Sequence, residues 1–169
     1  MSRSIALLVL LAACSATSGD GSPTTLVTTT TTTATTTTED RFDTGDLGPV
    51  EVSTVTVDGG ALDVAVASTP ESRSQGLRAV DDLGDLDGML FTWDGDIVTS
   101  RFNMRGTLIS LDVFFFDARG RFVDGFTMTP CENAPCPSYA ASAPYAYALE
   151  VPAGTLLDVE AGSSLSIAG

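Results

Sequence analysis

The sequence predicts a mainly β domain: a compact barrel, or a curled antiparallel or mixed sheet, of about seven or more short strands with one or two short helices. Two observations indicate this class. From residue 50 onward, apolar residues recur in short alternating runs that Gly, Pro and Asp separate. Many short runs in one segment are typical of barrels and curled sheets. The length of 169 residues is enough for one such domain and a tail.

The domain is expected to begin with a β-hairpin over residues 50–67. Valine recurs over 50–57 with one change of register, and apolar side chains alternate cleanly over 62–66. Between the two runs, Asp58-Gly59-Gly60 has the composition of a tight turn. Two alternating runs joined by such a turn predict a pair of antiparallel strands.

A short helix is expected directly after this hairpin. Ser68 or Thr69 can cap its amino end, and Pro70 suits the first turn. Glu71 complements the helix dipole at the same end. Gly76 is a typical terminating residue, so the predicted helix is only about two turns long.

The remaining strands are predicted where strand-like alternation resumes. Their expected ranges are 97–104, 110–117, 121–128, 145–151 and 163–168. The run Asp-Ala-Arg-Gly at 117–120 has the composition of a hairpin loop between two of these strands. Together with the first hairpin, these ranges predict at least seven strands.

The charged residues exclude several classes of function. The chain has 8 basic and 22 acidic residues, and every basic residue is Arg, because there is no Lys and no His. A Ser-His-Asp triad, a Cys-His pair, a Lys Schiff base and a His-ligated metal are therefore excluded. The net charge of -14 argues against nucleic acid as a partner, since phosphate contacts need a basic surface. No cofactor is indicated.

The N-terminal residues have the pattern of an export signal. Arg3 provides a positive charge, and residues 5–11 form an apolar run that is too short to span a membrane. Leu-Ala-Ala-Cys at 11–14 resembles the lipobox of bacterial lipoproteins; an ordinary secretory signal is the alternative, and both would export the chain. We expect a signal peptide over 1–13, lipid attachment at Cys14, and an extracytoplasmic protein anchored to its membrane by lipid.

Residues 14–49 are predicted to form a lipid-anchored, disordered stalk before a globular domain over 50–169. Twelve of the fifteen residues over 24–38 are Thr, and nothing alternates with them to form a buried face. We favour a passive spacer over a specific binding role for this segment.

Cys131 and Cys136 raise a choice between a disulfide, a redox pair and a metal site. An exported chain meets an oxidising environment, in which a disulfide is the default. A thioredoxin-like pair has two intervening residues, whereas four lie between these cysteines. A zinc site would need carboxylates for its other ligands, because the chain has no His. The sequence therefore predicts a disulfide that orders a local loop.

Several motifs of the domain resemble, in the same order, those of the family called domain of unknown function 192. They are TPESRSQGL (69–77), GMLF (88–91), MRGTLISLDVFFFD (104–117), the Pro–Cys loop and YALEVPAG (147–154). The resemblance implies a compact, mostly β domain with short helical pieces. It implies no established activity. Two positions depart from the family pattern, which often has an aromatic residue at Asn103 and an Asn at Gly106.

Asp112 is the first candidate for a functional side chain, because it lies inside an apolar strand pattern. A buried carboxylate needs a partner, or it takes up a proton. The candidate partners are Arg73, Arg101 and Arg105, of which Arg73 and Arg105 are also candidate binding residues. We favour a structural acceptor, bonded to backbone N–H groups or to an Arg, over a ligand-binding carboxylate.

Glu150 is the second candidate carboxylate. It could line a site together with Asp112, although an outward-facing position on its strand explains it more simply. Four large apolar side chains could line a pocket, but core packing explains them better. They are Met89, Phe91, Trp93 and Met104. Residues 82–90 carry three acids but lack the ligand pattern of a calcium loop, so no metal site is predicted.

These observations favour a non-catalytic protein that displays a β-rich binding module on a stalk. Its ligand could be a cell-wall glycan, a peptide or another envelope protein. The alternative is an envelope hydrolase that uses Asp112 and Glu150 as a carboxylate pair. Such pairs lie about 5–10 Å apart across an open cleft, so the position of the two side chains in the fold separates these hypotheses.

Overall fold

The computed structural model of the protein describes residues 43–156 and 158–168. The predicted signal peptide, the predicted lipid attachment at Cys14 and the Thr-rich segment lie outside the described residues. No helix in the described part of the chain is long and apolar enough to cross a membrane.

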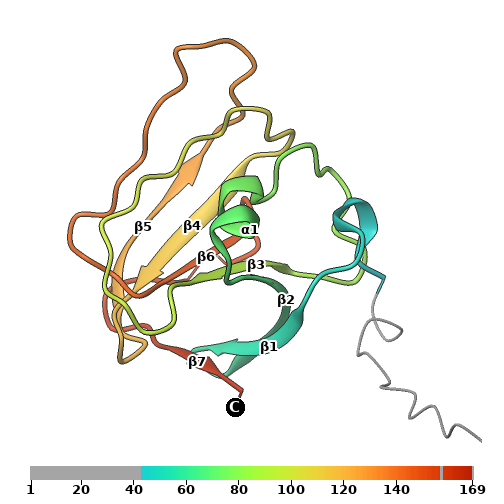
Figure 1. Ribbon diagram of the computed structural model, residues 1–169. Coiled ribbons are helices and arrows are strands. Elements are labelled where there is room, and N and C mark those ends of the chain that lie inside the picture. The colour runs from blue at the N-terminus through green and yellow to red at the C-terminus, as the bar shows by residue number, and fades with distance from the viewer. Residues whose placement is uncertain (1–42, 157, 169) are drawn as a thin grey trace, which may run out of the picture. The chain divides into compact units, whose positions relative to one another are not determined.

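The described residues form one seven-stranded mixed sheet (Figure 1). Its strands are β1 Val52–Val57, β2 Gly60–Ala67, β3 Gly88–Thr92, β4 Leu111–Phe116, β5 Phe122–Met128, β6 Tyr147–Pro152 and β7 Leu165–Ile167. Their order across the sheet is β5-β4-β6-β3-β2-β1-β7. Neighbouring strands are antiparallel, except that β2 and β3 are parallel. The predicted fold class is confirmed.

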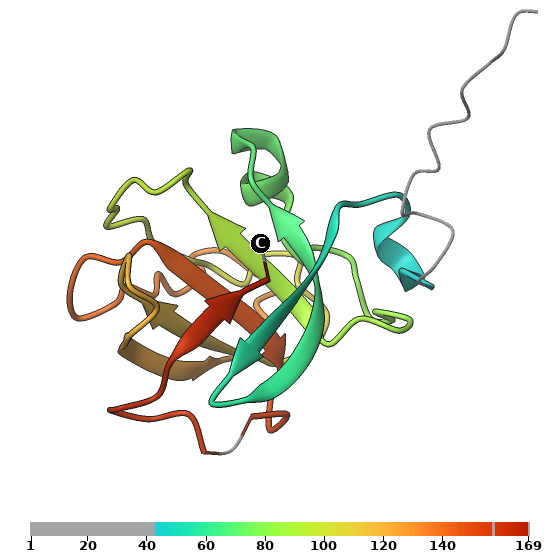
Figure 2. The ribbon, with the colours of Figure 1, turned by 90° about the horizontal axis from the view of Figure 1, so that it is seen from below.

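The sheet curls into a half-barrel that closes at one end (Figure 2). Arg121, which precedes β5, forms a bridge with Ser164, which precedes β7, so the two edges of the sheet meet there. The N–H of Leu165 donates to the carbonyl of Gly120 at 2.7 Å across the same junction. The curl therefore gives the sheet an enclosed inner face and an outer face.

Side chains that alternate along the strands form a separate hydrophobic cluster on each face. On β4, Phe114 and Phe116 belong to the inner-face cluster, whereas Val113 and Phe115 belong to the outer-face cluster. Leu165 from β7 also packs in the inner-face cluster. Each face thus buries one half of the same alternating pattern.

Segments outside the strands cover the outer face. Helix α1, Pro70–Gln75, lies beside the sheet (Figure 1). The segments outside the strands whose side chains contribute to the outer-face cluster are 47–50, 77–86, 93–109 and 131–146. The outer face therefore has a second layer that consists mostly of loops.

The predicted hairpin and helix are confirmed. Asp58 and Gly59 have φ values of 50° and 86°, as expected for a two-residue turn between β1 and β2. Thr69 is the N-cap of α1, and its side chain accepts from the backbone N–H of Ser72 at 3.1 Å. Gly76 ends the helix with a φ of 52°.

The prediction of a strand at 97–104 is wrong. The sheet still has seven strands, because β3, which was not predicted, is one of them. Residues 97–104 make only isolated bridges, from Val98 to Tyr145 and from Phe102 to Tyr139, and Ile97 is 65% exposed. The GMLF run instead lies between β2 and β6. Gly88 permits that position, because a Cβ there would lie 2.1 Å from the carbonyl oxygen of Glu150.

The domain begins earlier than the expected boundary at residue 50. Residues 43–49, which the sequence assigns to the stalk, contain a short 3-10 helix at Gly45–Leu47. The N–H of Asp46 donates to the carbonyl of Asp82 at 2.8 Å, and Leu47 packs against the outer-face cluster. These contacts join 43–49 to the domain.

Candidate functional site

A pocket of about 310 Å³ opens between α1 and the segment 100–103, over the outer face of the sheet. It is lined by Pro70, Arg73, Ser74, Gln75, Gly76, Leu77, Arg78, Phe91, Trp93, Ser100, Arg101, Phe102, Asn103, Thr107 and Glu150. This volume is at the lower end of the range for small-molecule sites.

Arg73, a predicted binding residue, lines the pocket from α1. Its Nη1 donates to the carbonyl of Thr92 at 2.8 Å and to the carbonyl of Ser68. Its guanidinium lies over the ring of Trp93, with the Cζ atom 5.4 Å from the ring centroid. Three contacts thus hold the Arg73 side chain in one position.

Two further arginines line the same pocket. Arg101 donates from Nε to the hydroxyl of Ser138 at 2.7 Å and from Nη2 to the carbonyl of the same residue at 3.0 Å. Arg78 is exposed and makes no side-chain hydrogen bond within the described residues. Arg78 was not among the predicted site residues, because nothing in its local sequence distinguishes it from a surface arginine.

The charge of the pocket lining is opposite to that of the domain. Two of the chain's eight arginines and three of its 22 acids precede residue 43, which leaves six arginines and 19 acids in the described part. Three of those arginines line the pocket, with Glu150 as the lining's sole acidic side chain. Within the described residues, the one ion pair joins Arg121 to Asp117. The pocket is therefore a cationic region on an acidic domain.

Glu150 faces the pocket rather than the exterior, which corrects the sequence-based interpretation. It lies on β6 between Met89 of β3 and Val113 of β4, and it is only 5% exposed. Its carboxyl group has no hydrogen-bond partner among the described residues. Burial raises the pKa of Glu150 to about 8, so the side chain is mostly protonated at neutral pH.

Asp112 lies on the opposite face of the sheet from Glu150. In the β4–β6 register, Asp112 is opposite Val151, whereas Glu150 is opposite Val113, so the two carboxylates point away from each other. Asp112 is half-buried, and accepts from the hydroxyl of Thr127 at 2.5 Å and from the N–H of Gly154 at 2.7 Å. This is the geometry of a structural acceptor, and no arginine takes part within the described residues.

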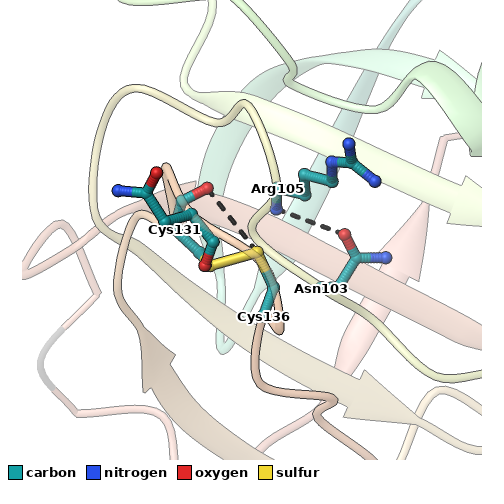
Figure 3. Close-up of a disulfide and its surroundings, with 5 residues drawn as sticks. Asn103, Arg105, Cys131 and Cys136 are labelled. Carbon is teal, nitrogen blue, oxygen red and sulfur yellow. Dashed lines mark hydrogen bonds between the residues drawn. A yellow bond between two sulfur atoms is a disulfide. The ribbon is translucent and has the colours of Figure 1, made fainter.

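Arg105, the fourth predicted site residue, lies outside the pocket lining. It is exposed, and its guanidinium points away from the neighbouring disulfide (Figure 3). Its backbone N–H donates to the Oδ1 atom of Asn103 at 3.2 Å. The backbone of Arg105 therefore helps to order the segment that carries Asn103, whereas its guanidinium does not line the pocket.

Cys131 and Cys136 are joined by a disulfide, which is compatible with the predicted pairing (Figure 3). The N–H of Cys131 donates to the carbonyl of Met104 at 3.1 Å. The N–H of Gly106 donates back to the carbonyl of Cys131 at 3.4 Å. The loop that the disulfide closes is thus attached to the segment next to the pocket.

Aromatic side chains form the apolar wall of the pocket. Phe91 and Phe102 meet edge to face with their centroids 5.1 Å apart, and both line the pocket. Trp93 is half-buried, and its ring meets that of Tyr145 edge to face with the centroids 5.4 Å apart. Met89 and Met104 are core residues, as the sequence predicts, whereas Phe91 and Trp93 also contact the pocket.

Tyr145 fixes the wall formed by residues 100–103. Its hydroxyl donates to the carbonyl of Ser100 at 2.8 Å, and its backbone pairs with Val98. Burial raises the pKa of Tyr145 to about 12, so the hydroxyl remains a donor at every physiological pH. The irregular segment therefore has a defined position although it is not a strand.

The lining contains no group that could activate a nucleophile in the manner of a His or Lys base. The chain has neither residue. Among the described residues, no three His, Cys, Asp or Glu side chains come together as metal ligands. The groups that the lining does present are cationic donors, aromatic rings and one buried carboxyl group.

The described residues thus form a small β domain, a curled mixed sheet that carries a pocket with a cationic lining on its outer face. The chain belongs to the DUF192 family, described as an uncharacterized ACR, whose model matches residues 53–167. The family resemblance seen in the sequence is thereby confirmed. The motif at 69–77 supplies much of the α1 side of the pocket, and Asn103, which departs from the family pattern, is also a lining residue.

Two solved structures share this fold. A proposed transcription regulator from Sinorhizobium meliloti 1021 is 26% identical with a TM-score of 0.61, over 70% of this chain and 95% of that chain. A protein of unknown function from Novosphingobium aromaticivorans DSM 12444 is 23% identical with a TM-score of 0.60, over 74% of this chain and 91% of that chain. No curated protein matches the chain.

Proposed function

We propose that this protein is an exported, lipid-anchored component of the cell envelope whose β domain is a non-catalytic binding module. The export signal and the lipobox-like run at residues 11–14 support the location. The pocket beside α1 supports the binding role, since it combines an apolar wall with convergent polar groups. The ligand is a molecule of the envelope: a cell-wall glycan, a peptide or part of another envelope protein.

The observation that carries the binding role is the lining itself. Arg73 and Arg101 are held by backbone carbonyls, so their remaining N–H groups are already positioned for a ligand. The alternative, a hydrolase with a carboxylate pair, requires both carboxylates to flank one cleft. Asp112 and Glu150 do not meet this requirement, because they lie on opposite faces of the sheet.

Nucleic acid is not the ligand that we propose. The chain carries 22 acidic and 8 basic residues, and a phosphate backbone would be repelled by most of its surface. We therefore do not extend the description of the Sinorhizobium protein as a transcription regulator to this chain. A compact pocket favours a small molecule or the end of a chain.

The binding role can be tested with a blocking substitution. Ser74 is an exposed residue of α1 that lines the pocket, so Ser74→Tyr should obstruct the pocket with little effect on folding. Glu71→Tyr, on the same helix but outside the lining, is the matched control. Both variants and the wild type are titrated with small-molecule fractions of a cell-envelope digest, and heat of binding is measured by calorimetry.

We expect at least one fraction to bind saturably to the wild type and to Glu71→Tyr, and about tenfold or more weakly to Ser74→Tyr. Equal binding to all three proteins would place the ligand elsewhere. The absence of saturable binding in every fraction would contradict the proposed function.

A further inference from the structure

We infer that the pocket takes a small anionic molecule, with a carboxylate or phosphate group held by the pocket arginines and a compact apolar or ring-shaped body. The inference rests on the proposed binding role and specifies the chemical class of ligand. It is carried by the charges, the donors and the aromatic residues of the lining.

The distribution of charge is the first argument. Half of the arginines in the described residues line one pocket of a domain in which acids outnumber arginines 19 to six. None of the three pocket arginines forms an ion pair with a described carboxylate. Arginines that line one pocket without an ion-pair partner give it a positive potential, which favours an oxyanion as the ligand.

The unused donors are the second argument. A guanidinium group has five N–H donors in a rigid fork. Arg73 uses Nη1 for two carbonyls, Arg101 uses Nε and Nη2 for Ser138, and Arg78 uses none within the described residues. Each arginine therefore retains N–H groups, and two of the three side chains are already fixed. Carboxylates and phosphates are the groups that match such donors in pairs.

Glu150 adds a buried polar group that faces the pocket without a protein partner. Its side chain lines the pocket, is 5% exposed and accepts no hydrogen bond from a described residue. Because burial holds its pKa at about 8, it presents a neutral carboxyl group, and not a second negative charge, at neutral pH. A neutral carboxyl can donate a hydrogen bond to an oxygen of the ligand.

The body of the ligand is indicated by the apolar wall. Phe91 of β3, Trp93 just after it and Phe102 of the segment 100–103 supply aromatic surface to the lining. The volume of about 310 Å³ suits a molecule with one ring and a short substituent better than an extended chain. An inorganic anion alone would leave this wall unused.

Trp93 provides a direct readout, since it is the chain's single tryptophan and it lines the pocket. Three probes share one body and do not absorb with tryptophan: cyclohexanecarboxylate, cyclohexyl phosphate and the neutral cyclohexanecarboxamide. The purified full-length protein is titrated with each probe at neutral pH and low salt. Binding is followed by Trp93 fluorescence and by calorimetry, so a spectroscopically silent event is still detected.

We expect at least one anionic probe to bind about tenfold or more tightly than the carboxamide, with affinity that falls as salt rises. Arg78→Gln should weaken that binding by about tenfold or more, because a hydrogen bond to a charged group is lost. Arg105→Gln makes the same change in net charge outside the lining and should leave the affinity within about twofold. Thermal melting of both variants verifies that they fold.

Tight binding of the carboxamide, unchanged by Arg78→Gln, would overturn the anionic class but leave the binding role intact. An equal loss of probe affinity in Arg78→Gln and Arg105→Gln would also overturn the anionic class, since the loss would then reflect net charge alone. If none of the probes binds, the inference is wrong, and the envelope fractions with Ser74→Tyr still decide the binding role separately. A preference between carboxylate and phosphate identifies the kind of oxyanion.

Discussion

The two faces of the sheet show how one alternating pattern can serve two purposes. The inner face is closed by its own edges, where Arg121 meets Ser164, and its cluster is formed mainly by strand residues. The outer face is covered by α1 and by loops, and the pocket lies between these covering segments. A face covered by loops leaves room for a pocket between the covering segments.

The two candidate carboxylates make this difference concrete. Asp112 is half-buried and has two donors, the Thr127 hydroxyl and the Gly154 N–H. Glu150 is almost fully buried and has no partner among the described residues. A hydrogen-bonded carboxylate stabilises a fold, whereas a carboxylate that is buried beside a pocket without a protein donor destabilises the fold when it is charged.

The largest expected effect concerns the pH dependence of stability at Glu150. Its pKa is 4.5 without burial and about 8 in the folded protein, so the folded state holds a proton that the unfolded state has released between these values. The free energy of unfolding should therefore fall as pH rises from 4.5 to 8, by about 5 kcal/mol at most. Glu150→Gln should remove most of this slope in urea unfolding measured across that range.

Comparing the pH dependence of the free energy of unfolding between the wild type and Glu150→Gln separates the contribution of Glu150 from those of other titrating groups. Asp58 and Asp117 accept hydrogen bonds that lower their pKa values, so their contributions change below pH 4 in both proteins. A slope in Glu150→Gln equal to that of the wild type would show that Glu150 is not kept protonated.

The next effect concerns Asp112 on the other face. Asp112→Ala removes the acceptor for Thr127 and Gly154, and such a loss costs about 1–3 kcal/mol. Asp112→Asn keeps one acceptor and should cost less. Urea unfolding at pH 7 gives the order; an Asp112→Ala protein as stable as the wild type would reject the structural role.

A smaller effect is expected from the segment that precedes β1. A chain that starts at Val50 lacks the hydrogen bonds of Asp43 and Asp46 to the loop at 82–85 and the packing of Leu47. It should be less stable by about 1–2 kcal/mol than a chain that starts at Asp43. Equal melting temperatures would show that residues 43–49 contribute nothing to the fold.

The smallest effect concerns the wall of the pocket. Tyr145→Phe removes the hydrogen bond to Ser100 but keeps the ring contacts with Trp93 and Phe115, so it should cost about 1 kcal/mol. Amide hydrogen exchange should increase over residues 98–103 and stay unchanged on β1 and β2. Uniform acceleration over all strands would contradict a local role.

Most of the sheet could be predicted because its strands alternate and end at turn residues. The segment 97–104 could not be predicted correctly, since its apolar residues pack singly through bridges and its backbone never joins a ladder. β3 is short and is buried at every residue except Thr92, so its run lacks the alternation that identified the other strands.

The pocket could not be predicted as a unit, because it joins residues from α1, β3, the segment 100–107 and β6. Arg73 was expected from its motif. The position of Glu150 on the outer face, toward the pocket, depends on a strand register that the sequence leaves open by one residue. Strand pairing, rather than local composition, decides that Glu150 and Asp112 lie on different faces.

The most direct test of an anion site on the outer face is a two-dimensional NMR titration of the purified protein with cyclohexanecarboxylate and, separately, with cyclohexyl phosphate. Backbone amides report from α1 and residues 76–78, from 100–103, and from the inner-face positions of β1 and β4. We predict saturable shifts concentrated on α1, 76–78 and 100–103, with amides of the inner-face residues Val55, Phe114 and Phe116 unchanged. Saturable shifts at those inner-face residues, or no saturable shifts with either anion, would contradict the account of an anion site on the outer face.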